Sequence, residues 1–187
     1  HGLGIGHIYE HALKGFSATI PPARLEKIKQ DPRVVFVSED RVVSIEAQTL
    51  PTGVDRINAE NKVNTGSGVQ VAVLDTGIDL KHPELKANIV GGKNCSNGSS
   101  YADGNGHGTH VAGTIAALNN TQGVVGVAPA VKLWAVRVLN NSGWGTWSSV
   151  ICGVDFVTSK APANGGPITV ANMSLGGEFT STILNTA

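Results

Sequence analysis

The sequence predicts an α/β protein built on a parallel sheet, with a small α+β unit in front of it. Three observations lead to this prediction: apolar runs of strand length in the second part of the chain, helical patterns between them, and a change in composition near residue 46. Strands that alternate with helices form parallel sheets with right-handed crossovers. In such sheets the functional side chains gather at the carboxyl ends of the strands.

The elements expected before residue 46 are short and lie among many charged residues. The alternation of Phe16, Ala18 and Ile20 predicts a half-buried strand. The two prolines that follow predict the start of a short helix, which we expect to turn Leu25 and Ile28 inward and to end before the next proline. Further extended segments are expected at 34–37 and 42–45, and mainly loop at 47–68.

The elements of the α/β part begin with residues 69–74, a nearly continuous apolar run typical of a strand buried on both faces. Alternating elements follow it along the chain. We expect strands at 131–138 and 168–173, helices at 110–118 and 148–158, and the start of another helix at 180–185.

The composition restricts the class of protein. Fourteen Lys and Arg balance fourteen Asp and Glu among the 187 residues, which argues against a protein that binds nucleic acid through phosphate contacts. No apolar run approaches the roughly 20 residues needed to span a bilayer, so no membrane partner is expected. The two cysteines, Cys95 and Cys152, either pair in a secreted setting or remain separate buried thiols.

Asp75 directly follows the first buried run, at the edge of the sheet where catalytic groups are expected. Gly77 lets the chain turn sharply away from this carboxylate. Taken alone, Asp75 is more typical of a residue that caps a helix or closes a turn.

His107 lies in a glycine-rich segment, residues 103–110, where flanking glycines leave its ring accessible. A histidine in this setting is suited to general-base catalysis, because its unperturbed pKa lies near neutral pH. There are two alternatives: His107 begins a helix and has no functional role, or His107 and His110 together coordinate a zinc ion. The spacing lacks the glutamate of the metalloprotease helix pattern, so we do not favour zinc, and we expect His110 to be buried.

Residues 172–177 leave the third predicted strand and contain two consecutive glycines. Such a segment exposes backbone groups to which an extended peptide can add as a further strand. In isolation this segment is more typical of an ordinary turn from a strand to a helix.

Together, residues 71–79, 105–114 and 172–177 resemble the subtilisin-like serine proteases, most of all the secreted subtilisin and proteinase K branches. Residues 9–20 and 37–40 are similar to the inhibitory propeptide of these enzymes. The resemblance implies a ferredoxin-like α+β propeptide domain over residues 1–46. It also implies the N-terminal part of a subtilisin-like catalytic domain over 47–187, incomplete at its C-terminal end.

The resemblance implies a role for each matching residue. Asp75 orients the imidazole of His107, which takes a proton from a serine that the family places beyond Ala187. A peptide substrate lies between two chain edges, one formed by Gly143, Trp144 and Gly145 and the other by Ser174, Leu175 and Gly176. Leu139 and Trp147 line an apolar pocket for the substrate.

A calcium site is also implied, built from side-chain oxygens and loop carbonyls, which suit Ca²⁺. Glu84 departs from the family, which more often has Asp there. No organic cofactor is expected. The implied calcium ligands are Gln48, Glu84, Leu118, Asn120, Gln122 and Val124.

The function implied is that of a secreted, monomeric serine endopeptidase precursor that hydrolyses protein or peptide substrates. Its own propeptide inhibits it until cleavage near the bond between Glu46 and Ala47. This chain alone is expected to be inactive, because the nucleophile is missing. The alternatives are a catalytically dead relative or a propeptide-type protease-binding protein. A nucleotide-binding domain is poorly supported, because the glycines of residues 66–68 precede the strand instead of following it.

Overall fold

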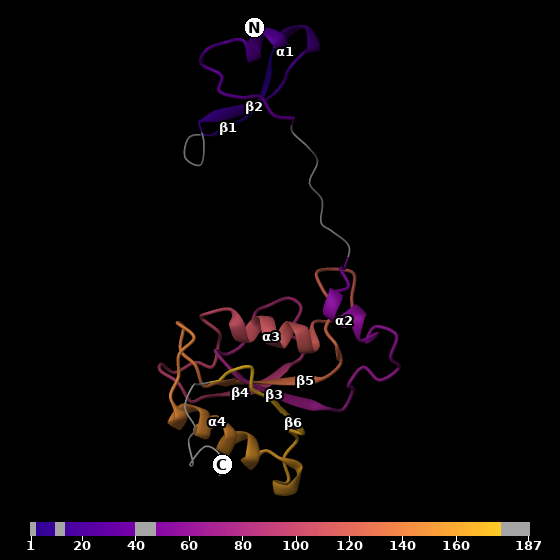
Figure 1. Cartoon of the computed structure of the whole chain (residues 1–187), viewed down its shortest axis with the longest axis vertical. Coiled ribbons are helices and arrows are strands. Elements are labelled where there is room, and N and C mark those ends of the chain that lie inside the picture. The colour runs from indigo at the N-terminus through magenta and orange to yellow at the C-terminus, as the bar shows by residue number, and fades with distance from the viewer. Residues whose placement is uncertain (1–2, 10–13, 40–47, 177–187) are drawn as a thin grey trace. The chain divides into compact units, whose positions relative to one another are not determined.

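The computed structural model describes residues 3–9, 14–39 and 48–176 of the chain. The chain divides into two compact units, His1–Ser44 and Ile45–Ala187. Each unit is described by itself below, with the labels of Figure 1.

The first unit contains two strands and a helix. β1 (Gly4–Tyr9) pairs antiparallel with β2 (Gly15–Thr19), and α1 (Pro22–Lys29) follows. Pro22 occupies the first helical turn, where its missing N–H costs nothing. Leu25 and Ile28 are the half-buried residues of this helix, as their spacing predicts.

The prediction of a strand at residues 34–37 is wrong. These residues are irregular, and Val35 and Phe36 are 94% and 73% exposed. β-branched and aromatic residues favour a strand only where a partner strand and a packing surface are available. The segment expected at 42–45 lies outside the described residues, as do the proposed cleavage bond and the helix expected at 180–185.

The second unit is built on a four-stranded sheet with the order β4-β5-β3-β6. The strands are β3 (Gln70–Asp75), β4 (Ile89–Asn94), β5 (Lys132–Arg137) and β6 (Val170–Asn172). All three pairings are parallel, which confirms the predicted parallel sheet. The sequence did not predict β4, since its two central glycines interrupt the apolar pattern. A Cβ on Gly91 would lie 2.6 Å from the Trp134 ring, so this strand needs glycine where the indole of β5 crosses it.

Helices cover both faces of this sheet. α3 (His107–Ala116) and α4 (Trp147–Ser159) lie on opposite sides of it in Figure 1. Val71 and Val73 of β3 pack in one apolar cluster with α3, while Ala72 and Leu74 pack in the other with α4. This division follows from the alternation of side chains along a strand.

Short helical segments complete the unit. α2 (Thr52–Arg56) lies in a stretch expected to be loop, and η1 (Pro162–Asn164) follows α4. Thr146 and Ser149 form a reciprocal capping box that begins α4 one residue before the predicted start. Within the described residues no helix is long and apolar enough to cross a membrane.

Cys95 and Cys152 form a disulfide with a Cα–Cα distance of 5.8 Å. Cys95 directly follows β4 and Cys152 lies in α4, so the bond ties this helix to the edge strand of the sheet. The structure thereby decides between the two states that the sequence left open.

Candidate active site

Asp75 and His107 are in hydrogen-bond contact, although 32 residues separate them. Nδ1 of His107 lies 2.8 Å from Oδ1 and 3.0 Å from Oδ2 of Asp75. Asp75 is the last residue of β3 and His107 the first of α3. The contact therefore joins the carboxyl end of a central strand to the start of a helix, at the edge where the sequence predicted it.

The Asp75 side chain is fully buried, whereas the His107 side chain is 52% exposed. Burial of a carboxylate is costly unless donors surround it. The N–H of Thr76 donates to Oδ1 at 2.7 Å, and the imidazole provides the other donor. When Nδ1 carries the proton shared with Asp75, the neutral ring keeps a lone pair on Nε2. Within residues 48–176 no hydrogen bond engages that Nε2, so the ring can accept a proton from an incoming group.

Gly108 allows this contact because only a glycine fits between α3 and β3. A Cβ on Gly108 would lie 2.2 Å from the carbonyl oxygen of Gly77 and 3.1 Å from the Asp75 side chain. The N–H of Gly108 donates to the Thr76 hydroxyl at 2.9 Å. The first turn of α3 is thus held directly against the end of β3.

Asp103 is a second acceptor at the start of α3, partly buried, and the sequence analysis gave it no role. Its Oδ1 accepts from the N–H groups of Asn105 and Gly106 at 2.8 and 3.0 Å and from the Thr76 hydroxyl at 2.8 Å. Its Oδ2 accepts from the N–H and the hydroxyl of Thr109 at 3.0 and 2.5 Å. Burial raises the pKa of the Asp103 carboxyl, but these donors outweigh it and lower that pKa to about 2. A carboxylate shortly before a predicted helix is the signal that identifies such a capping residue.

His110 does not share this environment. It is exposed, contrary to the burial expected from the sequence. Among the described residues no three His, Cys, Asp or Glu side chains are grouped so that they could hold a metal ion. Gly113, in the middle of the same helix, has nothing within 4 Å of its Cβ position.

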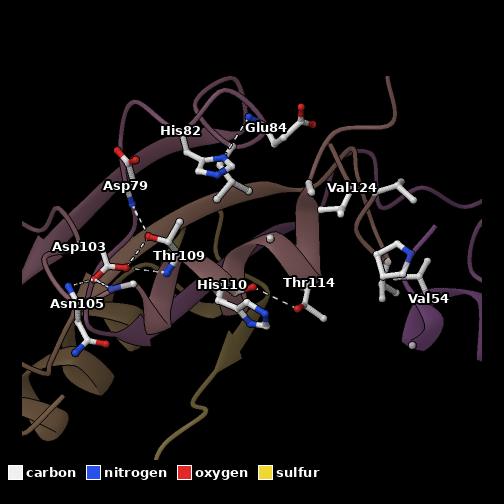
Figure 2. Close-up of a pocket in the computed structure, with 18 of the residues that line it drawn as sticks. Val54, Asp79, His82, Glu84, Asp103, Asn105, Thr109, His110, Thr114 and Val124 are labelled. Carbon is white, nitrogen blue, oxygen red and sulfur yellow. Dashed lines mark hydrogen bonds between the residues drawn. The ribbon is translucent and has the colours of Figure 1, made fainter. Parts of the chain in front are cut away.

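A cavity of about 1000 Å³ runs along this exposed side of α3. Figure 2 shows His110 and Thr114 of α3 at this cavity, with the Asp103 and Thr109 pair at the start of the same helix. His82 and Glu84 also line it. Asp75 and His107 do not line it, so this cavity is not the place where these two groups meet.

The first expected substrate edge, residues 143–145, is held by Asn140. The N–H of Asn140 donates to the Trp144 carbonyl at 2.8 Å, and its Oδ1 accepts from the N–H of Trp144 at 3.1 Å. Both backbone groups of Trp144 are therefore engaged, while its side chain is 75% exposed. The groups left for a peptide at this edge are the Gly143 carbonyl and the backbone of Gly145.

The second expected edge, residues 174–176, follows β6. Ser174 is exposed, and its Oγ accepts from the Asn172 amide at 3.0 Å. Leu175 packs against the same apolar cluster as Leu139, which the sequence analysis placed in the apolar substrate pocket. Gly176 is exposed, and Trp147 lies at the start of α4 with 36% of its surface exposed.

Three of the expected calcium ligands converge on Gln48. The carbonyl oxygens of Leu118, Gln122 and Val124 lie 2.7, 3.3 and 3.3 Å from the Gln48 side-chain amide nitrogen. Three carbonyls directed at one point form the kind of oxygen cluster that binds a hard cation. Rotation of the amide by 180° would place the Gln48 oxygen at the same point.

Glu84 and Asn120 complete this neighbourhood. The Asn120 amide donates to Glu84 Oε2 at 3.0 Å, and the buried Glu84 side chain reaches the loop at Gly123. The donor set contains carbonyl, amide and carboxylate oxygens, which fit Ca²⁺ in kind.

Comparison with known proteins gives matches over both units. A family model described as the subtilase family matches residues 66–186, and one described as peptidase inhibitor I9 matches residues 1–46. Subtilisin E of Bacillus subtilis (strain 168) is 45% identical over 175 residues, covering 91% of this chain and 44% of that protein. An alkaline protease of Shouchella clausii is 46% identical over 175 residues, with the same coverage. Subtilisin DY of Bacillus licheniformis is 51% identical over 146 residues, covering 75% of this chain and 50% of its own length.

The chain spans about half the length of these curated relatives. The subtilase model covers more than half of the chain and includes both residues of the buried contact described above. The I9 match covers the region ahead of it, as expected for a propeptide. With its parallel sheet, its Asp75–His107 contact and these matches, the chain belongs to the subtilase family.

Proposed function

We propose that this chain is the propeptide and proton-transfer part of a serine endopeptidase precursor. The observation that carries the proposal is the contact between the buried Asp75 carboxylate and Nδ1 of the half-exposed His107. In this proposal the serine nucleophile comes from sequence beyond residue 187. The 187-residue chain alone therefore does not hydrolyse peptides.

His107 acts as the general base in the proposed reaction. Asp75 fixes the tautomer in which Nε2 is unprotonated, so that Nε2 takes the proton from the attacking serine hydroxyl. The resulting imidazolium is stabilised by the buried carboxylate and then gives its proton to the leaving amine. The Thr76 N–H, which donates to Oδ1, holds the Asp75 carboxylate in place throughout these steps.

The substrate in this proposal is an extended peptide that pairs with backbone groups at both edges. Gly143 and Gly145 offer groups on one side, and residues 174–176 on the other. Leu139, Leu175 and the neighbouring Trp147 favour an apolar substrate side chain, since two of them border the same apolar cluster.

Calcium, secretion and processing are further parts of the proposal. Ca²⁺ is held by the Gln48 oxygen, the three loop carbonyls and Glu84, and it stabilises the loop without entering the reaction. The Cys95–Cys152 disulfide supports an oxidising, extracellular location. Residues 1–46 act as the intramolecular inhibitor until the bond between Glu46 and Ala47 is cut, and the mature enzyme is a monomer.

The experiment that tests this function uses a serine-directed fluorophosphonate on the chain extended through the following coding sequence. We expect the extended protein to be labelled and the 187-residue chain to remain unlabelled. Asp75→Asn should lower the labelling rate by about 10⁴-fold, the size of the effect in a related triad.

The matched control is Asp79→Asn, which changes an exposed aspartate that caps only the Lys81 N–H. It should be labelled at the unmodified rate. An extended protein that is folded but not labelled would identify a catalytically dead relative and overturn the proposal.

A further inference from the structure

Arg137 is a buried cation beside the candidate site. It is the last residue of β5, it lies opposite Asp75 in the register of the sheet, and it is 8% exposed. No carboxylate of the described residues forms an ion pair with it. A buried guanidinium without a carboxylate is stable only if neutral acceptors satisfy its donors. The structural role of Arg137 therefore depends on which acceptor groups its N–H donors bind.

The acceptors belong to two different loops at the carboxyl edge of the sheet. Arg137 donates to the Ser100 carbonyl at 3.1 Å and to Asn97 Oδ1 at 3.3 Å, both in the loop after β4. It also donates to the Leu139 carbonyl at 3.3 Å and to Asn141 Oδ1 at 2.9 Å, both in the segment after β5. A planar guanidinium presents several donors in fixed directions, so one side chain clamps both loops.

Asn141 extends this clamp to the turn that carries His107. The Asn141 carbonyl accepts from the Asn105 amide at 2.9 Å, and Asn105 Oδ1 accepts from the N–H of His107 at 3.2 Å. A Cβ on Gly104 would lie 2.3 Å from Asn141 Oδ1, so the turn packs directly on this amide. An unbroken path of hydrogen bonds thus runs from Arg137 through Asn141 and Asn105 to His107.

We propose that Arg137, acting through Asn141 and Asn105, is a positioning residue that couples segment 139–145, which ends in the 143–145 edge, to the backbone at His107. The proposal rests on the proposed function, in which that edge holds the peptide and His107 moves the proton. The Leu139 N–H also donates to the Asp75 carbonyl at 3.1 Å, so the same edge is attached to the strand that carries the carboxylate. A peptide that pairs with the edge is thereby aligned with the imidazole.

The experiment is amide hydrogen exchange, followed by NMR, on the 187-residue chain and its Asn141→Ala variant. Two amides report on the coupling: His107 N–H in the turn, and Asn140 N–H, which donates to Trp144 in the edge. We expect both to lose protection at least tenfold, while the amides of β3 keep theirs. Asn141→Asp retains the Oδ1 acceptor and should restore the protection of both.

Arg137→Lys is the second variant, since it keeps the positive charge but loses the planar guanidinium with its several N–H donors. It should lower the protection of the same two amides as Asn141→Ala does. Asn164→Ala is the control. It removes the hydrogen bond of 2.8 Å that the Asn164 side-chain amide donates to the Thr158 carbonyl near the end of α4. It should leave both reporting amides unchanged.

Unchanged protection at His107 in Asn141→Ala would overturn the inference. So would an equal loss at His107 and in β3, because that pattern indicates general destabilisation instead of coupling. Hydrogen exchange needs no nucleophile, so this result is independent of the phosphonate test of the proposed function.

Discussion

Replacement of Asp103 by asparagine tests how the start of α3 is held. Each oxygen of the Asp103 carboxylate accepts from at least two donors, including three backbone N–H groups in all. An asparagine has one oxygen and one NH₂ group at the same two positions. In either orientation at least one backbone N–H faces another donor, because the hydroxyls can rotate and the amides cannot.

The expected cost follows from two independent considerations. A buried N–H without an acceptor costs about 1–3 kcal/mol. The lowering of the Asp103 pKa from 3.8 to about 2 corresponds to about 2 kcal/mol, and to about 1–2 kcal/mol after discounting for its partial exposure. We therefore expect Asp103→Asn to lower the free energy of unfolding of the second unit by about 2 kcal/mol at pH 7.

The assay is urea unfolding followed by tryptophan fluorescence. All three tryptophans lie in the second unit, so the signal reports on that unit alone. Asp79→Asn is the matched control, since this exposed aspartate accepts from only one backbone N–H and the asparagine oxygen can replace it. It should change the free energy of unfolding by less than about 0.5 kcal/mol.

The difference between the unmodified protein and Asp103→Asn should also depend on pH. The pKa of Asp103 is lower in the folded state than its ordinary value of 3.8. The stabilisation is therefore complete above about pH 4 and is lost as the pH falls through about 2. A difference that stays below about 0.5 kcal/mol at pH 7, or that grows between pH 4 and 2, would refute the assignment of Asp103 as the ionised acceptor of this network.

Three further predictions concern the disulfide, the glycines of α3 and calcium. Cys152→Ser should lower the free energy of unfolding by about 4 kcal/mol, because the bond closes a loop with a sequence separation of 57. Reduction should shift the urea midpoint of the unmodified protein but not of this variant, and equal shifts would contradict the pairing. Gly108→Ala should destabilise by about 3 kcal/mol or more, since its Cβ would meet a backbone carbonyl at 2.2 Å, whereas Gly113→Ala has open space and should be neutral or stabilising by up to about 1 kcal/mol. Equal urea midpoints for these two variants would be inconsistent with the close packing of α3. Ca²⁺ at a hundredfold excess over its Kd should stabilise the protein by about 2.7 kcal/mol, seen as a rise in Tm. Gln48→Ala should lose most of this rise, and a Tm that Ca²⁺ does not change would exclude the site.

Local patterns in the sequence were sufficient to predict the parallel sheet and the two helices that cover it. The run at residues 69–74 is apolar at consecutive positions because β3 has a helix on each face, so both sets of alternating side chains are buried. β4 was not predicted because Gly91 and Gly92 interrupt the apolar pattern of its sequence. Glycines are needed there because aromatic rings from other segments pack against them. The strand expected at 34–37 did not form for the opposite reason, since strand propensity does not supply a pairing partner.

In the candidate site, too, some features could be predicted from the sequence and others could not. The sequence by itself predicted which residues would carry the proposed chemistry, from a carboxylate at the end of a buried strand, a histidine among glycines, and the family resemblance of those segments. Only the tertiary structure decided that Asp75 and His107 touch, that Asp103 holds the helix start, that the two cysteines pair and that Arg137 joins the loops after β4 and β5. These contacts link residues up to 57 positions apart, and their formation depends on how the strands and helices pack, which no local period of the sequence specifies.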